Sequence, residues 1–167
     1  ALEYVGREVF DAPCSLELDA RRPVTPSIAS SKSEMNRALA IAAMRKGETT
    51  IEGDSDADDV RAMRAGIASL QKRQIADAKN GGTTFRFLTA VAVSDPAGGR
   101  VRIGDQLAAR PHEPLLSALR DAGVSIVQRE QVFEFGPLPD GAVEVDVDAR
   151  RSSQFASAIA LLAASGR

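Results

Sequence analysis

The sequence predicts an α/β fold built from repeated units, and three observations support this class. Three Ala-rich helical segments carry almost no charge, and amphipathic helical patterns lie between them. Short β-type runs bounded by Gly follow the first two apolar segments. Two of these runs end in similar sequences, Ile-Glu-Gly-Asp at 51–54 and Arg-Ile-Gly-Asp at 102–105, so the chain repeats its own pattern.

The three apolar helices set the spacing of the other elements. They are expected to begin near Ser33, Thr83 and Ser153 and to extend to about residues 44, 93 and 162. Helices that are apolar almost all round belong inside a fold. We therefore expect all three helices in the core.

Two further kinds of element fill the intervals between the apolar helices. The patterns predict β-runs at 47–54 and 99–105 and amphipathic helices at 58–70 and 111–122. Gly123 follows the last of these and is expected to stop it, because glycine readily adopts the left-handed conformation that ends a helix.

The later strands complete one unit and open another. Strands at 124–127 and 132–135 give the middle of the chain the order βαβαββ. Alternating apolar and acidic residues at 143–147 predict the first strand of a third unit, which is incomplete. Leu70 passes directly into 71–77 with no room for a hairpin, so the first unit is short.

Composition indicates a globular protein and disfavours several classes. The 167 residues are 44% hydrophobic and 26% charged, which suits one domain. With 21 Lys and Arg against 23 Asp and Glu, and no basic tract, a nucleic-acid partner is disfavoured. The apolar run at 156–164 is far short of the roughly 20 residues that cross a membrane. The first residues lack a signal-peptide pattern, so we expect a cytoplasmic protein.

The sequence offers little for metal or cofactor binding. With Cys14 and His112 the only residues of their kinds, a Cys/His metal site cannot form, and no metal or cofactor is expected. A buried thiol is expected for Cys14. His112 lies between two prolines at a helix entry, which favours a solvated or capping role. Phosphate-loop and G-x-G-x-x-G patterns are absent, so nucleotide binding is disfavoured.

The starts of the three apolar helices are candidate anion sites. A helix N-terminus offers free N–H donors and partial positive charge. Four cations lie beside helix starts: Lys32, Arg37, Arg86 and Arg110. The simpler reading is that Ser33, Thr83 and Ser153 cap their helices, each contributing about 1 kcal/mol. Both roles are compatible. The acidic residues at 54–59 lack the spacing of a calcium loop and are expected to begin the next helix.

Five motifs follow one another along the chain: Ser31-Lys32-Ser33 with Asn36-Arg37-Ala38, then Asp58-Asp59-Val60-Arg61, Asn80-Gly81-Gly82-Thr83-Thr84-Phe85-Arg86, Ala109-Arg110-Pro111 and Ser152-Ser153-Gln154-Phe155. In this order they resemble the motifs of the enolpyruvyl transferases, and among them those of the 5-enolpyruvylshikimate-3-phosphate (EPSP) synthases. The third departs from the usual N-A-G-T-x-x-R at Gly81, and Ala109 replaces the usual Glu beside Arg110. The resemblance covers most of the chain from about residue 16 onward.

The resemblance implies a fold, an activity and different roles for two domains. Each domain of that family is an inside-out α/β barrel of three βαβαββ units around parallel helices. Residues 1–167 would form one shikimate-3-phosphate-binding domain with units at about 16–77, 78–140 and 141–167, and a second, C-terminal domain would supply most acid–base groups. The implied reaction transfers the enolpyruvyl group of phosphoenolpyruvate to the 5-hydroxyl of shikimate-3-phosphate, in the shikimate pathway of aromatic amino-acid biosynthesis.

The resemblance also implies site residues. For shikimate-3-phosphate these are Lys32, Ser33, Arg37, Ser152, Ser153 and Gln154. For phosphoenolpyruvate, and for the inhibitor glyphosate, they are Lys32, Asn80, Gly82, Arg110 and Gln154. Lys32 is the one catalytic candidate in the chain. Two alternatives remain, a non-catalytic domain that binds shikimate-3-phosphate and a sister transferase for a nucleotide sugar. The second is disfavoured because that group lacks S-K-S and S-S-Q-F together.

Overall fold

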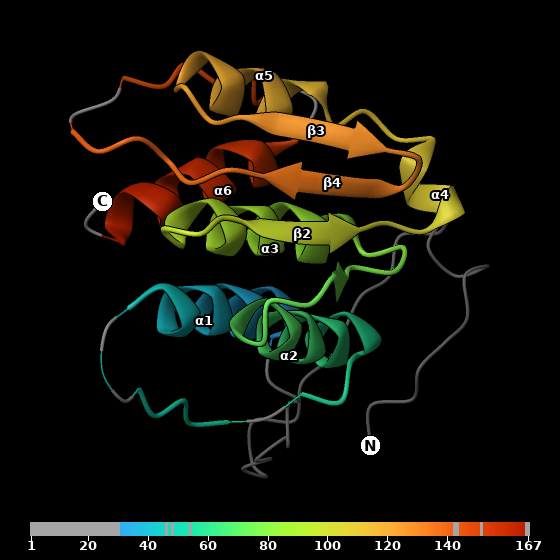
Figure 1. Cartoon of the computed structure of the whole chain (residues 1–167). Helices are drawn as coiled ribbons and strands as arrows, with labels where there is room; N and C mark the ends of the chain where they lie inside the picture. Colours follow the sequence, from blue (N-terminus) through green and yellow to red (C-terminus); the bar gives the residue numbers. More distant parts are fainter. Residues whose placement is uncertain are drawn as a thin grey trace, which may run out of the picture.

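The computed structural model describes residues 31–45, 47, 49–53, 55–141, 144–150 and 152–165. Figure 1 shows the elements in two layers, a sheet and the helices that cover one of its faces. The expectations for Cys14 and for the start of the first unit lie outside the described residues.

Parallel helices form the first layer. Within the described residues they are α1 (Lys32–Met44), α2 (Asp58–Gln71), α3 (Gly82–Ser94) and α6 (Ser153–Ala164). All four run in the same direction, with their N-terminal ends on the side of α4 (Figure 1). Helix α3 contacts α1, α2 and α6, so it is the centre of this layer. The three predicted apolar helices and the first amphipathic helix are confirmed to within one or two residues.

A mixed sheet lies against α3. In the described part of the chain its strands are β1 (Ala76–Asp77), β2 (Gly99–Arg102), β3 (Ile126–Arg129) and β4 (Val132–Phe135), in the order β1-β2-β4-β3. Strand β1 is parallel to β2, whereas β4 is antiparallel to both of its neighbours. The short α4 (Asp105–Ala108) and then α5 (Glu113–Asp121) follow β2. The order β1-α3-β2-α5-β3-β4 is a complete βαβαββ unit, as the sequence predicts.

The core forms between α3 and the sheet. Every residue from Thr84 to Ser94 is buried, which fits a helix that is apolar all round. Val101, Phe133 and Phe135 face it from the sheet and are 0–2% exposed. Burying a Val or Phe side chain contributes about 1.5–3 kcal/mol, so this layer is a major source of stability.

The two β-runs outside the central unit are not strands. Residues 49–53 and 55–57 form no strand, and neither do 144–150. A strand needs a hydrogen-bonded neighbour, and none of the described strands lies beside either run. Val145 and Val147 are half-buried, whereas the acidic residues beside them are exposed. The predicted alternation is therefore present in the burial of the side chains, but the segment is not a strand.

The boundaries of the central unit follow local rules. Gly123 has φ +87°, and its N–H donates to Arg120 O at 2.8 Å, so the predicted stop of the second amphipathic helix is confirmed. No hairpin follows Leu70: the chain turns through Arg73, whose φ is +59°, and enters β1 directly. Strand β3 begins two residues later than predicted, because the turn of the hairpin lies at Glu130 and Gln131.

Helices α1 and α6 are less buried than their composition predicts. Buried residues of α1 are limited to Met35, Asn36 and Ala40, and Ile41 is 37% exposed. Helix α6 buries Phe155 and a few residues of the same face. Only α3 has neighbours on all sides, so the expectation of full burial holds for α3 and is wrong for the outer two within the described structure.

Candidate functional site

The N-terminal ends of α1, α3 and α6 gather at one end of the helical layer (Figure 1). The helix caps lie one or two residues before the predicted positions. Ser31 Oγ accepts from Glu34 N at 3.4 Å, and Ser152 Oγ accepts from Gln154 N at 3.3 Å. Gly81 occupies the same position before α3 without a side-chain cap. The capping role expected for Ser33, Thr83 and Ser153 is therefore wrong, because all three lie inside the first helical turn.

An ion pair and a hydrogen bond join the starts of α1, α2 and α3. Lys32 Nζ lies 3.0 Å from Asp59 Oδ2, and the lysine side chain stays 52% exposed. Thr84 Oγ1 donates to the Asp59 carbonyl oxygen at 3.3 Å. Asp59 is a first-turn acid of α2, as predicted, but its pairing with Lys32 could not be read from their spacing. The contact orients the ammonium group of Lys32 at the start of α1.

Arg37 also lies on the first turns of α1. Its Nη1 donates to Ser33 O at 3.3 Å, which folds the side chain back along its own helix toward the N-terminal end. The Ser33 and Ser153 side chains are exposed on their respective helix starts. The start of α1 therefore contributes two cations, Lys32 and Arg37, and the exposed hydroxyl of Ser33 to the candidate site.

Two close approaches shape the segment before α3. Asn80 Oδ1 lies where a Cβ at Gly104 would be, so only glycine fits beside the Asn80 side chain. A Cβ at Gly82 would lie 3.1 Å from Arg86 Nη1, so Gly82 leaves room for that guanidinium. These contacts bring Asn80 and Gly82 together with the loop after β2.

Arg86 is a buried cation in the middle of this end. The side chain is 8% exposed, its Nη1 donates to Gln154 Oε1, and its guanidinium lies 4.5 Å above the centre of the Phe155 ring. Its Nε has no hydrogen-bond partner among the described residues. Burial, and then repulsion from Arg110, lowers the pKa of Arg86. The sequence identifies Arg86 only as a cation beside a helix start. Its position in the third motif is the one sequence signal that it has a further role in the site.

Arg110 lies close enough to Arg86 to repel it, and its side chain is exposed. Neither arginine forms an ion pair with any carboxylate of the described residues. Two neighbouring cations without an acid create a positive potential at the starts of α3 and α6. Such a site favours an anion.

His112 is a core residue, so the solvated or capping role expected for it is wrong. It is 7% exposed, its ring packs edge-on against Phe85 at 4.9 Å, and Nε2 lies 2.7 Å from Leu107 O. Burial lowers the pKa of His112, and the charges of Arg86 and Arg110 lower it further. The ring is therefore kept neutral and adds no third charge.

The predicted residues thus form two connected groups. Direct contacts link Gly82, Arg86 and Gln154, and Arg110 lies beside them. Lys32 is linked to the start of α3 through Asp59 and Thr84. Helix α1 also packs on α6, but no hydrogen bond within the described residues joins the Lys32 side chain to Ser152 or Ser153.

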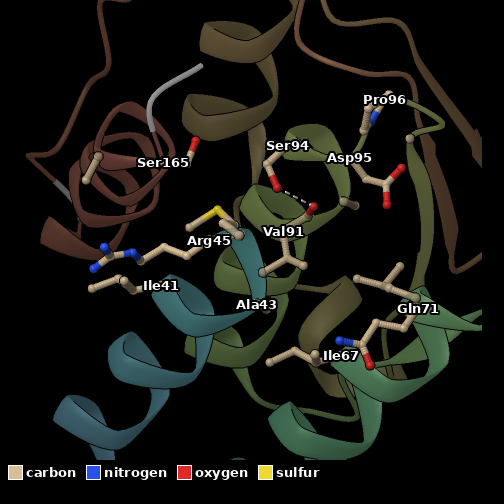
Figure 2. Close-up of a pocket in the computed structure, with 15 residues that line it drawn as sticks. Ile41, Ala43, Arg45, Ile67, Gln71, Val91, Ser94, Asp95, Pro96 and Ser165 are labelled. Atoms are coloured by element: carbon tan, nitrogen blue, oxygen red, sulfur yellow. Dashed lines mark hydrogen bonds between the residues drawn. The ribbon is translucent and has the colours of Figure 1, made fainter. Parts of the chain in front are cut away.

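A large cavity lies at the opposite end of the helices. It has a volume of about 920 Å³ and is lined by the C-terminal ends of α1, α2, α3 and α6, including Ile41, Gln71 and Ser94 (Figure 2). It contains none of the predicted site residues. The predicted site residues lie at the helix starts, away from this cavity.

Two classes of feature are missing from the part of the chain that the structure describes. None of its helices combines the length and the apolar character that a membrane span requires. No three His, Cys, Asp or Glu side chains among the described residues lie close enough together to hold a metal ion.

Known proteins with similar sequences and folds are EPSP synthases. A 3-phosphoshikimate 1-carboxyvinyltransferase of Bacteroides fragilis is 31% identical over 163 residues, covering 93% of this chain and 37% of the relative. One from Thermococcus kodakarensis is 33% identical over 151 residues, covering 80% of this chain and 37% of the relative. The solved EPSP synthase of Acinetobacter baumannii superposes with a TM-score of 0.68 at 19% identity, over 81% of this chain and 37% of the other.

The chain spans 37% of the length of these relatives. The sequence pattern of one family matches residues 66–166, which is more than half of the chain and includes the complete βαβαββ unit. The chain therefore belongs to the EPSP synthase (3-phosphoshikimate 1-carboxyvinyltransferase) family.

Proposed function

We propose that this chain is the shikimate-3-phosphate-binding part of an enzyme that transfers the enolpyruvyl group of phosphoenolpyruvate to the 5-hydroxyl of shikimate-3-phosphate. One observation carries the proposal. The helix starts that hold the S-K-S, N-G-G-T and S-S-Q motifs lie at one end of the fold, together with two arginines that no described carboxylate neutralises. Both substrates are anions, and charge-assisted hydrogen bonds contribute about 1.5–3 kcal/mol each.

The shikimate-3-phosphate residues are assigned by charge and position. Ser152 and Ser153 begin α6, where the helix N-terminus favours the phosphate group. Ser33 lies in the first turn of α1 and Arg37 one turn later, and both suit the carboxylate of the ring. Lys32 and Gln154 lie beside these groups and complete the set.

The phosphoenolpyruvate residues are Lys32, Asn80, Gly82, Arg110 and Gln154. Arg110 is exposed and unpaired among the described residues, so it is available to an anionic ligand. Gly82 begins α3, whose first N–H groups are free donors. Glyphosate, which is also an anion, is proposed to inhibit by binding at the same place.

The proposed chemistry is addition followed by elimination. C3 of phosphoenolpyruvate takes a proton, and the 5-hydroxyl oxygen attacks C2 and loses its own proton. The C–O bond to phosphate then breaks and C3 gives a proton back, which leaves the enol ether and free phosphate. Lys32 is the proposed contributor from this chain to charge or proton management. The other acid–base groups are proposed to come from a second domain, and the cytoplasmic location stays a prediction.

Calorimetry with shikimate-3-phosphate tests the binding, and phosphate release tests the reaction. The chain is expected to bind shikimate-3-phosphate alone and to release phosphate from phosphoenolpyruvate once the second domain of the family is added. Binding without turnover in the two-domain protein would support the alternative of a non-catalytic binding domain. A folded chain that binds no shikimate-3-phosphate contradicts both readings.

Arg110→Ala separates the two substrate sites. The substitution is expected to weaken the binding of phosphoenolpyruvate or glyphosate about tenfold or more in the presence of shikimate-3-phosphate, because one charge-assisted contact is lost. The affinity for shikimate-3-phosphate itself is expected to stay within about twofold, and Arg120→Ala, which removes another exposed arginine, serves as the control. Equal losses for both ligands contradict the assignment of Arg110 to phosphoenolpyruvate.

A further inference from the structure

Arg86 is the buried group of the candidate site to which none of the roles above is assigned. It belongs to α3, whereas its hydrogen-bond partner Gln154 belongs to α6, 68 residues later. We propose that Arg86 is a positioning residue that fixes the side-chain amide of Gln154, so that the amide NH₂ group of Gln154 faces the anionic ligand. This inference rests on the proposed function, because it concerns how Gln154 binds there.

The chemistry of the pair determines which way the amide points. A guanidinium has N–H donors and no acceptor, so the group of Gln154 that meets Arg86 Nη1 must be the oxygen Oε1. The amide nitrogen Nε2 is then directed away from Arg86, and it donates to no described residue. Two donors are left for a ligand at the start of α6.

The surroundings of Arg86 restrict its movement. The guanidinium lies 4.5 Å above the Phe155 ring, which supports one of its faces. Gly82 lies against Nη1, where a Cβ would be 3.1 Å away, and the same Cβ would be 3.7 Å from Leu107 Cδ1. The arginine is therefore held between α6 and the start of α3, in a place where a larger residue at position 82 would displace it.

Arg86 and Arg110 have different roles because their side chains differ in exposure to solvent. Arg86 is 8% exposed and already donates to Gln154, so little of it is open to a ligand, whereas Arg110 is exposed. Fixing a flexible side chain in advance matters, because immobilising one on binding costs about 0.5–1.5 kcal/mol. Arg86 lowers this cost for Gln154 and adds its charge to the potential of the site.

A double-mutant cycle with shikimate-3-phosphate as the probe tests the inference. Arg86→Met and Gln154→Met are each expected to raise the Kd about tenfold, and the double variant is expected to be no weaker than the weaker single variant. The effects of the two substitutions on the Kd are not additive, because each substitution removes the same oriented amide. Arg120→Met, which removes an exposed arginine of α5, is the matched control and should leave the Kd unchanged. Losses that add in the double variant would show that Arg86 contacts the ligand itself and would overturn the inference.

A second measurement needs no Arg86 variant and no ligand. Nitrogen-15 relaxation of the Gln154 side-chain amide, identified by the signal that Gln154→Glu removes, reports whether Nε2 is ordered in the free protein. An ordered amide is the expected result, and a mobile one overturns the inference even if Arg86→Met fails to fold. Wild-type protein that binds no shikimate-3-phosphate defeats the proposed function instead, so the two failures are distinguishable.

Discussion

At the scale of single residues, burial decides roles that residue type leaves open. His112 lies between two prolines in the sequence, yet it fills a core position against Phe85. Its Nε2 hydrogen bond to Leu107 O fixes the ring, and Nδ1 is buried with no hydrogen-bond partner in the described part of the chain. A solvated histidine and a core histidine have the same local sequence, so only the packing distinguishes them.

The pKa of His112 predicts how stability depends on pH. Because burial and two nearby arginines lower the folded-state pKa below 6.5, the unfolded chain binds the proton first as the pH falls. The free energy of unfolding should therefore decrease as the pH falls through about 6.5 toward the folded-state pKa. His112→Gln keeps a donor for Leu107 O but does not titrate, so its decrease between about pH 7.5 and 5.5 should be smaller.

Urea unfolding of both proteins at the two pH values measures this difference. The carboxylates that titrate in the same range are common to both proteins, so they cancel in the comparison. An equal loss of stability in wild type and His112→Gln would show that His112 is not the responsible group.

Gly81 illustrates a departure from the family pattern that the structure explains. Its φ of −81° is accessible to any residue, so backbone freedom does not require glycine here. A Cβ at this position would lie 2.7 Å from Thr84 Oγ1, the hydroxyl that donates to Asp59 O. The absence of a side chain at Gly81 therefore leaves room for the hydroxyl of Thr84.

At the scale of elements, the close contact of α2 with α3 depends on a glycine. Gly66 is buried in the middle of α2, where a Cβ would lie 2.6 Å from Leu88 Cδ1. Leu88 is fully buried and has little room to move. The amphipathic pattern of α2 predicts its inward face but not how near its partner comes.

Gly66→Ala tests this contact. Alanine raises helix propensity by about 1 kcal/mol, whereas overpacking costs about 1–3 kcal/mol. We expect a net loss of about 1 kcal/mol in the free energy of unfolding, measured in urea. Adding Leu88→Val should recover part of it, and Ala65→Ser on the exposed side of α2 is the control. A Gly66→Ala protein more stable than wild type would contradict the close contact.

At the scale of the whole molecule, stability is expected to decrease outward from α3. This helix is covered by α1, α2, α6 and the sheet, whereas α1 and α6 each bury one face within the described structure. Amides of 84–94 should exchange with solvent deuterium at least about tenfold more slowly than those of 153–162, because local opening exposes less core in an outer helix.

Hydrogen exchange of the native protein, followed by mass spectrometry of peptides, measures this order. The α5 peptide, which lies in the complete βαβαββ unit, is expected to fall between the two. Exchange of α6 as slow as that of α3 would show that the outer helix is covered as completely as the central one.

The sequence by itself determined what depends on near neighbours along the chain. Helix periodicity, the stop at Gly123 and the hairpin of β3 and β4 are short-range properties, and the structure agrees with all three. The order of the motifs along the chain also indicates the family. Expectations that needed a partner were wrong, such as the strands at 47–54 and 143–147, because a strand forms only beside another strand.

Tertiary structure decided which side chains meet. The pairs Lys32–Asp59 and Arg86–Gln154 join residues far apart in sequence, and burial lowers the pKa of both Arg86 and His112. The parallel packing of the helices places their N-terminal ends at one edge, which no single motif specifies. The physical reason is that periodicity and capping act over a few residues, whereas desolvation and charge pairing depend on every neighbour in space.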